Sequence, residues 1–153
     1  MAKFPSEVEE TVVVPATPAR TYEFLWDVLG SSFCIPGIDR CEAAGDDTYR
    51  FIYKSRSTGP VSMVVQYTAR YEGNGTDRIT FESFGAEGDN TDVRGTIRLE
   101  PYGPGTRVVM KQMISPDTPV PRLLQSLIRS FVEAETATAV REYLANVRGE
   151  LER

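Results

Sequence analysis

A long segment near the C-terminus constrains the fold more than any other part of the chain. It runs from Thr118 to Leu151 and contains no glycine before Gly149. Thr118 followed by Pro119 is typical of a helix start, because a threonine side chain caps the first turn and proline suits the first helical position. We therefore predict one helix over this segment, about 45 Å long at roughly 1.5 Å per residue.

The apolar residues of this predicted helix lie on two faces rather than one. At about 100° per residue, the first face carries Leu124, Leu127, Ile128, Phe131 and Glu135. The second face is rotated by roughly a quarter to a third of a turn and carries Val132, Ala139, Val140, Tyr143, Val147 and Leu151. We interpret one half of the helix as a lid and the other as an anchor, on a helix that crosses a curved sheet or bends near residues 135–138.

Composition and charge exclude several classes of function. The 153 residues are 41% hydrophobic and 25% charged, which indicates one soluble globular domain, residues 1–153. The net charge of −5 argues against a nucleic-acid partner, because binding phosphates needs clustered lysine and arginine. No apolar run is long enough to span a membrane, and no secretory signal follows Met1. We therefore expect a cytoplasmic protein.

The chemistry-bearing residues are also restricted. Histidine is absent, which removes the commonest general base and the commonest metal ligand. Cys34 and Cys41 are the only cysteines, too few for a disulfide framework or a four-ligand zinc site, and we expect both to be small buried hydrophobic residues. No glycine-rich loop of the kind that cradles phosphates is present. We expect no metal and no other cofactor.

The remaining segments predict strands and one helical region. Residues 9–14 indicate a first strand, and Thr17-Pro18 opens a helix to about Val28 that Gly30 ends, followed by a helical turn at residues 31–35. Alternating apolar and polar residues then predict six strands separated by turn residues: 38–43, 49–55, 61–71, 79–83, 94–100 and 106–114. Consecutive strands with short turns pair antiparallel, so the order predicts an α+β fold in which the long helix covers one face of the sheet.

Several short motifs, in this order and spacing, resemble one superfamily. They are the segment at residues 12–27 (VVVPATPARTYEFLWD), IPGI at 35–38, Gly59-Pro60, GTIRLEP at 95–101 and GTRV at 105–108. Together they resemble the START-like helix-grip (SRPBCC) superfamily, which includes polyketide cyclases, and they are most similar to its CoxG-like branch, which is named after a protein of the carbon monoxide dehydrogenase system. The resemblance implies a curved seven-stranded antiparallel sheet wrapped around the C-terminal helix, with one or two short helices after the first strand.

The resemblance also implies an apolar cavity between sheet and helix. Members of this superfamily hold lipids, sterols, quinones or polyketides there, and they range from carriers to aromatase/cyclases. CoxG-like members are associated with the membrane side of carbon monoxide oxidation. For this chain we therefore expect a hydrophobic small-molecule ligand, no integral membrane segment but possible peripheral contact with a membrane, and a monomeric or homodimeric state.

The alternation predicts which side chains face the interior. From the sheet these are Tyr49, Phe51, Tyr53, Met63, Val65, Tyr67, Phe81, Ser83, Ile97, Met110 and Gln112, and from the helix Leu124, Leu127, Phe131 and Glu135. Large aromatic and flexible side chains with a few polar tips suit a cavity for an apolar ligand. The alternative is that the same side chains simply fill a hydrophobic core.

These residues are compatible with three functions. The first is a carrier or binding protein for a hydrophobic small molecule. The second is a polyketide aromatase/cyclase that uses Tyr53, Tyr67 and Glu135 to polarise carbonyls and transfer protons. Glu135 is costly to bury on an apolar face, which suits proton transfer, unless it lies at the edge and reaches solvent or an arginine. The third is an accessory subunit whose cavity has lost its ligand.

Overall fold

The computed structural model describes residues 2–58 and 60–153. Within these residues the chain forms ten strands, three α-helices and two short 3₁₀ helices. In order they are β1 (Ala2–Lys3), β2 (Ser6–Val14), α1 (Pro18–Trp26), α2 (Val28–Ser31), η1 (Ser32–Cys34), β3 (Ile38–Gly45), β4 (Thr48–Tyr53), β5 (Arg56–Thr58), β6 (Val61–Met63), β7 (Gln66–Gly73), β8 (Arg78–Ser83), β9 (Thr91–Tyr102), β10 (Gly105–Thr118), η2 (Arg122–Leu124) and α3 (Gln125–Leu151).

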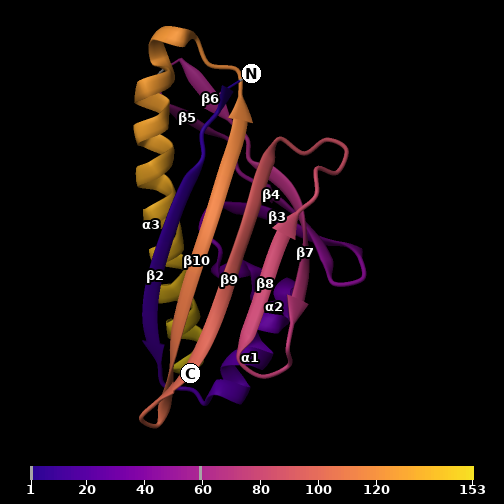
Figure 1. Cartoon of the computed structure of the whole chain (residues 1–153), viewed down its shortest axis with the longest axis vertical. Helices are drawn as coiled ribbons and strands as arrows, with labels where there is room; N and C mark the ends of the chain where they lie inside the picture. Colours follow the sequence, from indigo (N-terminus) through magenta and orange to yellow (C-terminus); the bar gives the residue numbers. More distant parts are fainter. Residues whose placement is uncertain (1, 59) are drawn as a thin grey trace.

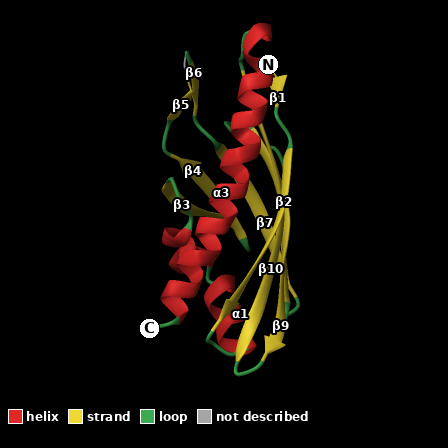
Figure 2. Cartoon of the chain, turned by 90° about the vertical axis from the view of Figure 1, so that its left-hand side faces the viewer, coloured by secondary structure: helices red, strands yellow, loops and turns green. Residues whose placement is uncertain are grey.

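The main sheet is antiparallel throughout and carries α3 on one face. Its strands follow the order β3, β4, β7, β8, β9, β10 and β2, and the two-residue β1 extends it by pairing with the far end of β10. Figure 1 shows this sheet with α3 along its edge and behind it, and Figure 2 shows that α3 and α1 lie on the same side. The predicted α+β helix-grip architecture with seven main strands is confirmed.

The helices after β2 form where the capping residues predict. Thr17 accepts a hydrogen bond from the backbone N–H of Arg20 at 3.3 Å, and Pro18 occupies the first turn of α1. Gly30, however, does not end a helix. The Asp27 carboxylate accepts a hydrogen bond from the Gly30 N–H at 3.1 Å and caps a second short helix, α2, that contains this glycine. The two successive caps, at Thr17 and Asp27, therefore turn the chain sharply on the side of the sheet that also carries α3.

The start of the long helix differs from the prediction. Thr118 pairs with Ala2 as the last residue of β10, and α3 begins at Gln125 after the 3₁₀ turn η2. Pro121 supplies the reason, because a proline disfavours the helical conformation of the residue before it. Thr118 is therefore not a helix cap, and α3 has 27 residues, about 40 Å at 1.5 Å per residue.

The predicted strand over residues 61–71 is also interrupted. It divides into β6, which pairs with β5 in a separate two-stranded sheet, and β7, which belongs to the main sheet. At the break, the side chain of Asn90 accepts a hydrogen bond from the Gln66 N–H at 3.0 Å and donates one to the Val64 carbonyl at 2.5 Å. An amide from a neighbouring loop thus replaces the strand ladder, which allows the β5–β6 hairpin to leave the sheet.

Two hydrophobic clusters hold α3 against the sheet. The larger cluster includes Phe51 and Ile97 of the sheet and the C-terminal half of α3. The smaller cluster joins Phe4 and Val61 to the N-terminal half. The helix side chains that are buried in these clusters or between them are Ile128, Val132, Thr136, Val140, Leu144, Val147 and Leu151. The C-terminal half of α3 therefore packs against the main sheet, and the N-terminal half packs against Phe4 and the β5–β6 hairpin.

Candidate functional site

Two adjoining cavities lie between the sheet and α3. The lower cavity, of about 70 Å³, lies between the α1–α2 region and the middle of the sheet. The upper cavity, of about 130 Å³, lies under the β5–β6 hairpin and the N-terminal half of α3. Both cavities share four lining residues: Pro36, Tyr53, Gln112 and Ala139. The partition between the cavities is therefore made largely of side chains.

Four tyrosines line or border the lower cavity and give it its chemistry. The hydroxyls of Tyr53 and Tyr67 are hydrogen-bonded to each other at 3.0 Å. Burial raises the pKa of Tyr53 to about 12, and burial also raises the pKa of Tyr67, Tyr71 and Tyr143 above its usual value. At neutral pH all four are uncharged phenols, so they donate hydrogen bonds and do not act as bases.

Two of these phenols have no protein partner. Within the described part of the chain, the hydroxyls of Tyr71 and Tyr143 form no hydrogen bond, although both side chains line the lower cavity. Both side chains are only partly buried, and neither hydroxyl is among the fully enclosed polar atoms that lack a partner, so each hydroxyl is accessible from the cavity or from solvent. Gln112 adds an amide that borders both cavities. The lower cavity thus combines aromatic walls with free hydrogen-bond donors.

The upper cavity is more aliphatic and ends at an ion pair. Met63, Val65 and Phe131 form part of its wall. At its edge, the guanidinium of Arg56 lies 2.7 Å from the carboxylate of Glu135, with side chains that are 56% and 38% exposed. Arg56 is therefore the arginine that the sequence analysis considered as a partner for Glu135 at the edge of the cavity. The ion pair connects the β5–β6 hairpin to α3.

Most of the side chains that the sequence placed inside line one of these cavities. The lower cavity contacts Phe51, Tyr67, Phe81, Ile97 and Met110, the upper contacts Met63, Val65, Phe131 and Glu135, and Tyr53 and Gln112 contact both. The structure therefore brings these candidates together around two adjoining cavities. It does not identify a ligand, so their role in binding stays a prediction.

Four candidates lie outside both cavities. Tyr49 packs edge-on against Tyr71 with ring centres 5.6 Å apart, and Ser83 accepts a hydrogen bond from the backbone N–H of Val93 at 2.9 Å. Leu124 packs against the smaller hydrophobic cluster, and Leu127 is 55% exposed. The expectation that Leu127 faces the interior is wrong, because Ile128 and Val132 take the buried positions of that half of α3.

Sequence reasoning missed several residues that line the lower cavity. Tyr71 continues the alternation of Tyr67 on β7, and Tyr143 was assigned to the second helix face, so both had a signal. Ser31, Ile35 and other residues of the α1–η1 region had none. They line the lower cavity only because the two helix caps at Thr17 and Asp27 fold that region beneath the sheet.

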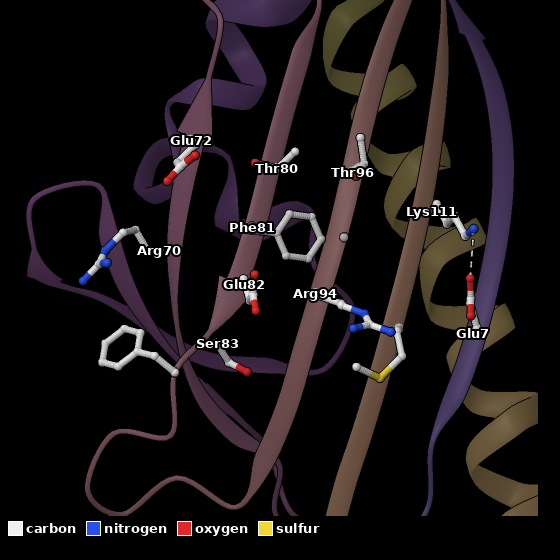
Figure 3. A pocket seen from close by; sticks show the side chains of 13 residues that line it. Glu7, Arg70, Glu72, Thr80, Phe81, Glu82, Ser83, Arg94, Thr96 and Lys111 are labelled. Carbon is white, nitrogen blue, oxygen red and sulfur yellow. Dashed lines mark ion pairs between the residues drawn. The ribbon is translucent and has the colours of Figure 1, made fainter.

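A larger groove lies on the opposite face of the sheet. It has a volume of about 640 Å³, and its lining includes Arg70, Glu82 and Arg94. Figure 3 shows these charged side chains around Phe81, with the ion pair between Lys111 and Glu7 at 3.1 Å. Charged walls of both signs suit neither an apolar ligand nor a desolvated site. We therefore place the candidate site in the interior cavities.

Metal and thiol chemistry find no support in the arrangement of the side chains. Within residues 2–58 and 60–153, no group of three or more histidine, cysteine, aspartate or glutamate side chains is arranged to hold a metal ion. Both cysteines are free thiols, and burial raises the pKa of Cys34 and Cys41 to about 11.

No helix among the described residues combines the length and the apolar character needed to cross a membrane.

Solved structures with the same fold include aromatase/cyclases. The Zhui aromatase/cyclase from Streptomyces sp. R1128 superposes with a TM-score of 0.69 and 19% identity, covering 97% of this chain and 94% of that one. The di-domain aromatase/cyclase StfQ from the steffimycin biosynthetic pathway gives 0.64 and 14%, covering 97% and 51%. The protein TTHA0849 from Thermus thermophilus gives 0.60 and 20%, covering 92% and 96%. At these identities the likeness establishes the fold.

Sequence comparison identifies a family for this chain but no individual curated relative. No curated protein matches the chain significantly. A family match, in contrast, extends over residues 5–152, nearly the full chain that encloses the two cavities. The chain therefore belongs to the family described as polyketide cyclase / dehydrase and lipid transport.

Proposed function

We propose that this protein binds a hydrophobic small molecule that carries carbonyl or quinone oxygens, in the interior between the sheet and α3. The observation that carries the proposal is the pair of unpartnered phenols, Tyr71 and Tyr143, in an aromatic cavity. Apolar walls favour an apolar ligand at about 25 cal/mol per Å² buried. Neutral phenols provide hydrogen bonds to ligand oxygens that accept them.

The volumes require the interior to open when a ligand enters. Ligand cavities typically measure roughly 300–1,000 Å³, and the two cavities here measure about 70 and 130 Å³. Their shared wall offers a route, because rotation of the Tyr53 and Gln112 side chains would join them. A linear or fused-ring ligand would then lie along α3, with its polar oxygens near Tyr71 and Tyr143.

The ligand class follows from this chemistry more than from any relative. Quinones, polyketides and lipids with carbonyl groups all combine apolar bodies with hydrogen-bond acceptors. The CoxG-like resemblance of the motifs favours a quinone or a lipid, and the solved aromatase/cyclases of the same fold favour a polyketide. We propose carriage or binding of such a ligand in the cytoplasm as the primary function.

The binding proposal is tested with a matched pair of substitutions on α3. Ala139 borders both cavities, whereas Ala134 is exposed on the same helix. Ala139→Phe should fill the junction and abolish binding of a naphthoquinone measured by calorimetry, and Ala134→Phe should leave it unchanged. Native mass spectrometry of the purified protein should also reveal a co-purifying apolar molecule. Equal binding by both variants would overturn the proposed site.

A second candidate function is cyclisation of a polyketide. The specific observation in its favour is that Glu135 is the one carboxylate among the described residues that line either cavity, with the phenols of Tyr53 and Tyr67 deeper inside. The phenols would polarise ketone carbonyls, and Glu135 would accept a proton from the carbon between two ketones before ring closure. Its contact with Arg56 would have to open first.

Turnover of a reactive poly-β-ketone by wild-type and Glu135→Gln protein separates the two functions. An enzyme of this kind should form a cyclised product and lose most of its rate with glutamine at this position. A binding protein should show saturable binding in both forms and no product above the uncatalysed background. An interior that binds neither a naphthoquinone nor a poly-β-ketone would instead favour an accessory subunit without a ligand.

A further inference from the structure

The mouth of the upper cavity carries more positive than negative charge, in contrast to the protein as a whole. The charged side chains among the described residues that line this cavity are Lys54, Arg56 and Glu135, whereas the net charge of the chain is −5. Arg56 contacts Glu135 at 2.7 Å, and Lys54 forms no ion pair within the described part of the chain. One cation at the mouth is therefore not matched by an anion of the protein.

The main chain holds the segment that carries both cations at this place. The backbone N–H of Tyr53 donates a hydrogen bond to the Val65 carbonyl at 3.0 Å, and that of Lys54 donates one to the Gly37 carbonyl at 2.9 Å. Val65 and Gly37 both line the upper cavity. Figures 1 and 2 show the β5–β6 hairpin, which begins at Arg56, beside the N-terminal half of α3. The backbone, and not only the ion pair, thus places the cations at the mouth.

The ion pair shows which chemical group Arg56 can hold there. A guanidinium presents its N–H groups in a planar fork that matches a carboxylate. Glu135 supplies that carboxylate from α3, and its side chain is 38% exposed, so it can turn away into solvent. A carboxylate that belongs to a ligand has the same charge and shape. It could therefore replace Glu135 at Arg56, with Lys54 as a second cation.

The helix also sets the spacing between this mouth and the phenols of the lower cavity. Glu135 and Tyr143 lie on the same helix, eight residues apart, which corresponds to about 12 Å at 1.5 Å per residue. Ala139 lies midway between them and borders both cavities. Groups that could bind the two ends of an elongated ligand are therefore about 12 Å apart along α3.

We propose that the ligand is an acidic amphiphile whose carboxylate binds Arg56 and Lys54 at the mouth of the upper cavity. Its apolar body extends along α3 towards the phenols, where a keto or quinone oxygen accepts a hydrogen bond. Glu135 competes with the ligand for Arg56, so binding displaces one carboxylate by another. This inference rests on the proposed binding function and adds a charged end to the ligand.

Calorimetry with a matched pair of ligands tests the proposal. The probes are a naphthoquinone that carries a decanoic acid side chain and the methyl ester of the same compound, which lacks the charge. Wild-type protein should bind the acid about twofold to fivefold more tightly than the ester at low salt, because contacts between partly exposed charges are weak. High salt should reduce this preference.

Substitutions of the two partners in the ion pair should have opposite effects on the acid. Arg56→Gln should remove most of the preference for the acid, whereas Glu135→Gln should strengthen binding of the acid about twofold to fivefold, since the competing carboxylate is lost. Both substitutions break the same contact, so they should affect the ester alike. Lys54→Gln should lower the preference for the acid. Lys111→Gln removes the same charge from the opposite face of the sheet and should leave the preference unchanged.

The ester separates failure of this inference from failure of the binding function. Equal binding of acid and ester by wild-type protein would overturn the acidic end and leave the binding function in place. Binding of neither probe would overturn both. Weaker binding of the acid by Glu135→Gln would contradict the competition at Arg56 and overturn the inference. An equal loss of preference at Lys54→Gln and Lys111→Gln would also overturn it, because the preference would then reflect only the overall charge.

Discussion

The two halves of α3 perform different structural tasks. The C-terminal half buries Val140, Leu144, Val147 and Leu151 in the large cluster against the sheet. The N-terminal half buries Ile128 and Val132 in the small cluster, exposes Leu127 and borders the upper cavity. One helix thus anchors the fold at one end and borders a cavity at the other. We propose the N-terminal half as the side from which a ligand enters.

The largest expected difference between the halves is in stability. Leu144→Ala should lower the free energy of unfolding by about 2–5 kcal/mol, because it leaves a cavity in the large cluster. Leu127→Ala, the same substitution in the N-terminal half, should change it by less than about 0.5 kcal/mol. Urea unfolding at equilibrium measures both. Equal losses would show that the two halves are packed alike and would contradict the comparison.

The lower cavity should make stability sensitive to alkaline pH. Burial raises the pKa of Tyr53 to about 12 and raises that of Tyr71 as well, so the folded protein holds these phenol protons more tightly than the unfolded chain does. The resulting stability is complete below about pH 10, the usual tyrosine pKa, and is lost as pH rises through the folded-state values. Between about pH 6 and 8 these phenols should not change the free energy of unfolding, because they stay protonated in both the folded and the unfolded chain.

Unfolding measured in urea at pH values from about 8 to 12 tests this dependence. Tyr71→Phe should reduce the alkaline loss, since one buried titrating phenol is removed. Tyr102→Phe is the control, because Tyr102 is half exposed on the surface. If both variants lose stability with pH as steeply as wild type, burial of the lower-cavity phenols is not the cause.

Ligand affinity should depend on single hydroxyls in the lower cavity. Removing one hydrogen bond costs about 0.5–1.5 kcal/mol, so Tyr143→Phe should weaken naphthoquinone binding by about 2-fold to 12-fold. Tyr49→Phe makes the same change outside both cavities and should have no effect. Calorimetry of both variants gives the comparison. A loss of the same size at Tyr49 would mean that the ligand is held elsewhere.

The smallest effect is expected at the ion pair over the upper cavity. Because Arg56 and Glu135 are partly exposed, their coupling in a double-mutant cycle with glutamine should be about 0.2–1 kcal/mol and should decrease in high salt. Either glutamine variant should also bind a naphthoquinone faster, because the contact connects the hairpin to α3. Unchanged association rates, measured by stopped flow, would show that this edge is not the entrance.

The architecture could be predicted because its signals are local. Alternation along the strands and the cap at Thr17 are set by residues close in sequence, and the predicted sheet and helices followed from them. Two boundaries were wrong, one for a local reason and one for a reason that involves another segment. Pro121, inside the predicted helix, moved the start of α3 to Gln125, and the Asn90 side chain, from a loop farther along the chain, interrupted the strand over residues 61–71.

The interior was less predictable than the architecture because it depends on how elements meet. Periodicity indicated that Tyr53 and Tyr67 face inwards, but their mutual hydrogen bond depends on the register of β4 against β7. The unpartnered hydroxyl of Tyr143 depends on where α3 crosses the sheet. The exposure of Leu127 follows from which neighbouring residues fill the small cluster. None of these facts is encoded by a single segment.

Methionine methyl NMR tests the central claim, occupancy of the interior by a ligand, most directly. Met110 lines the lower cavity, Met63 lines the upper cavity, and Met113 lies in the groove on the opposite face of the sheet. On titration with a naphthoquinone, the methyl signals of Met110 and Met63 should shift together and saturate, while that of Met113 stays in place. Saturable shifts at Met113 with none at Met63 and Met110 would contradict the account.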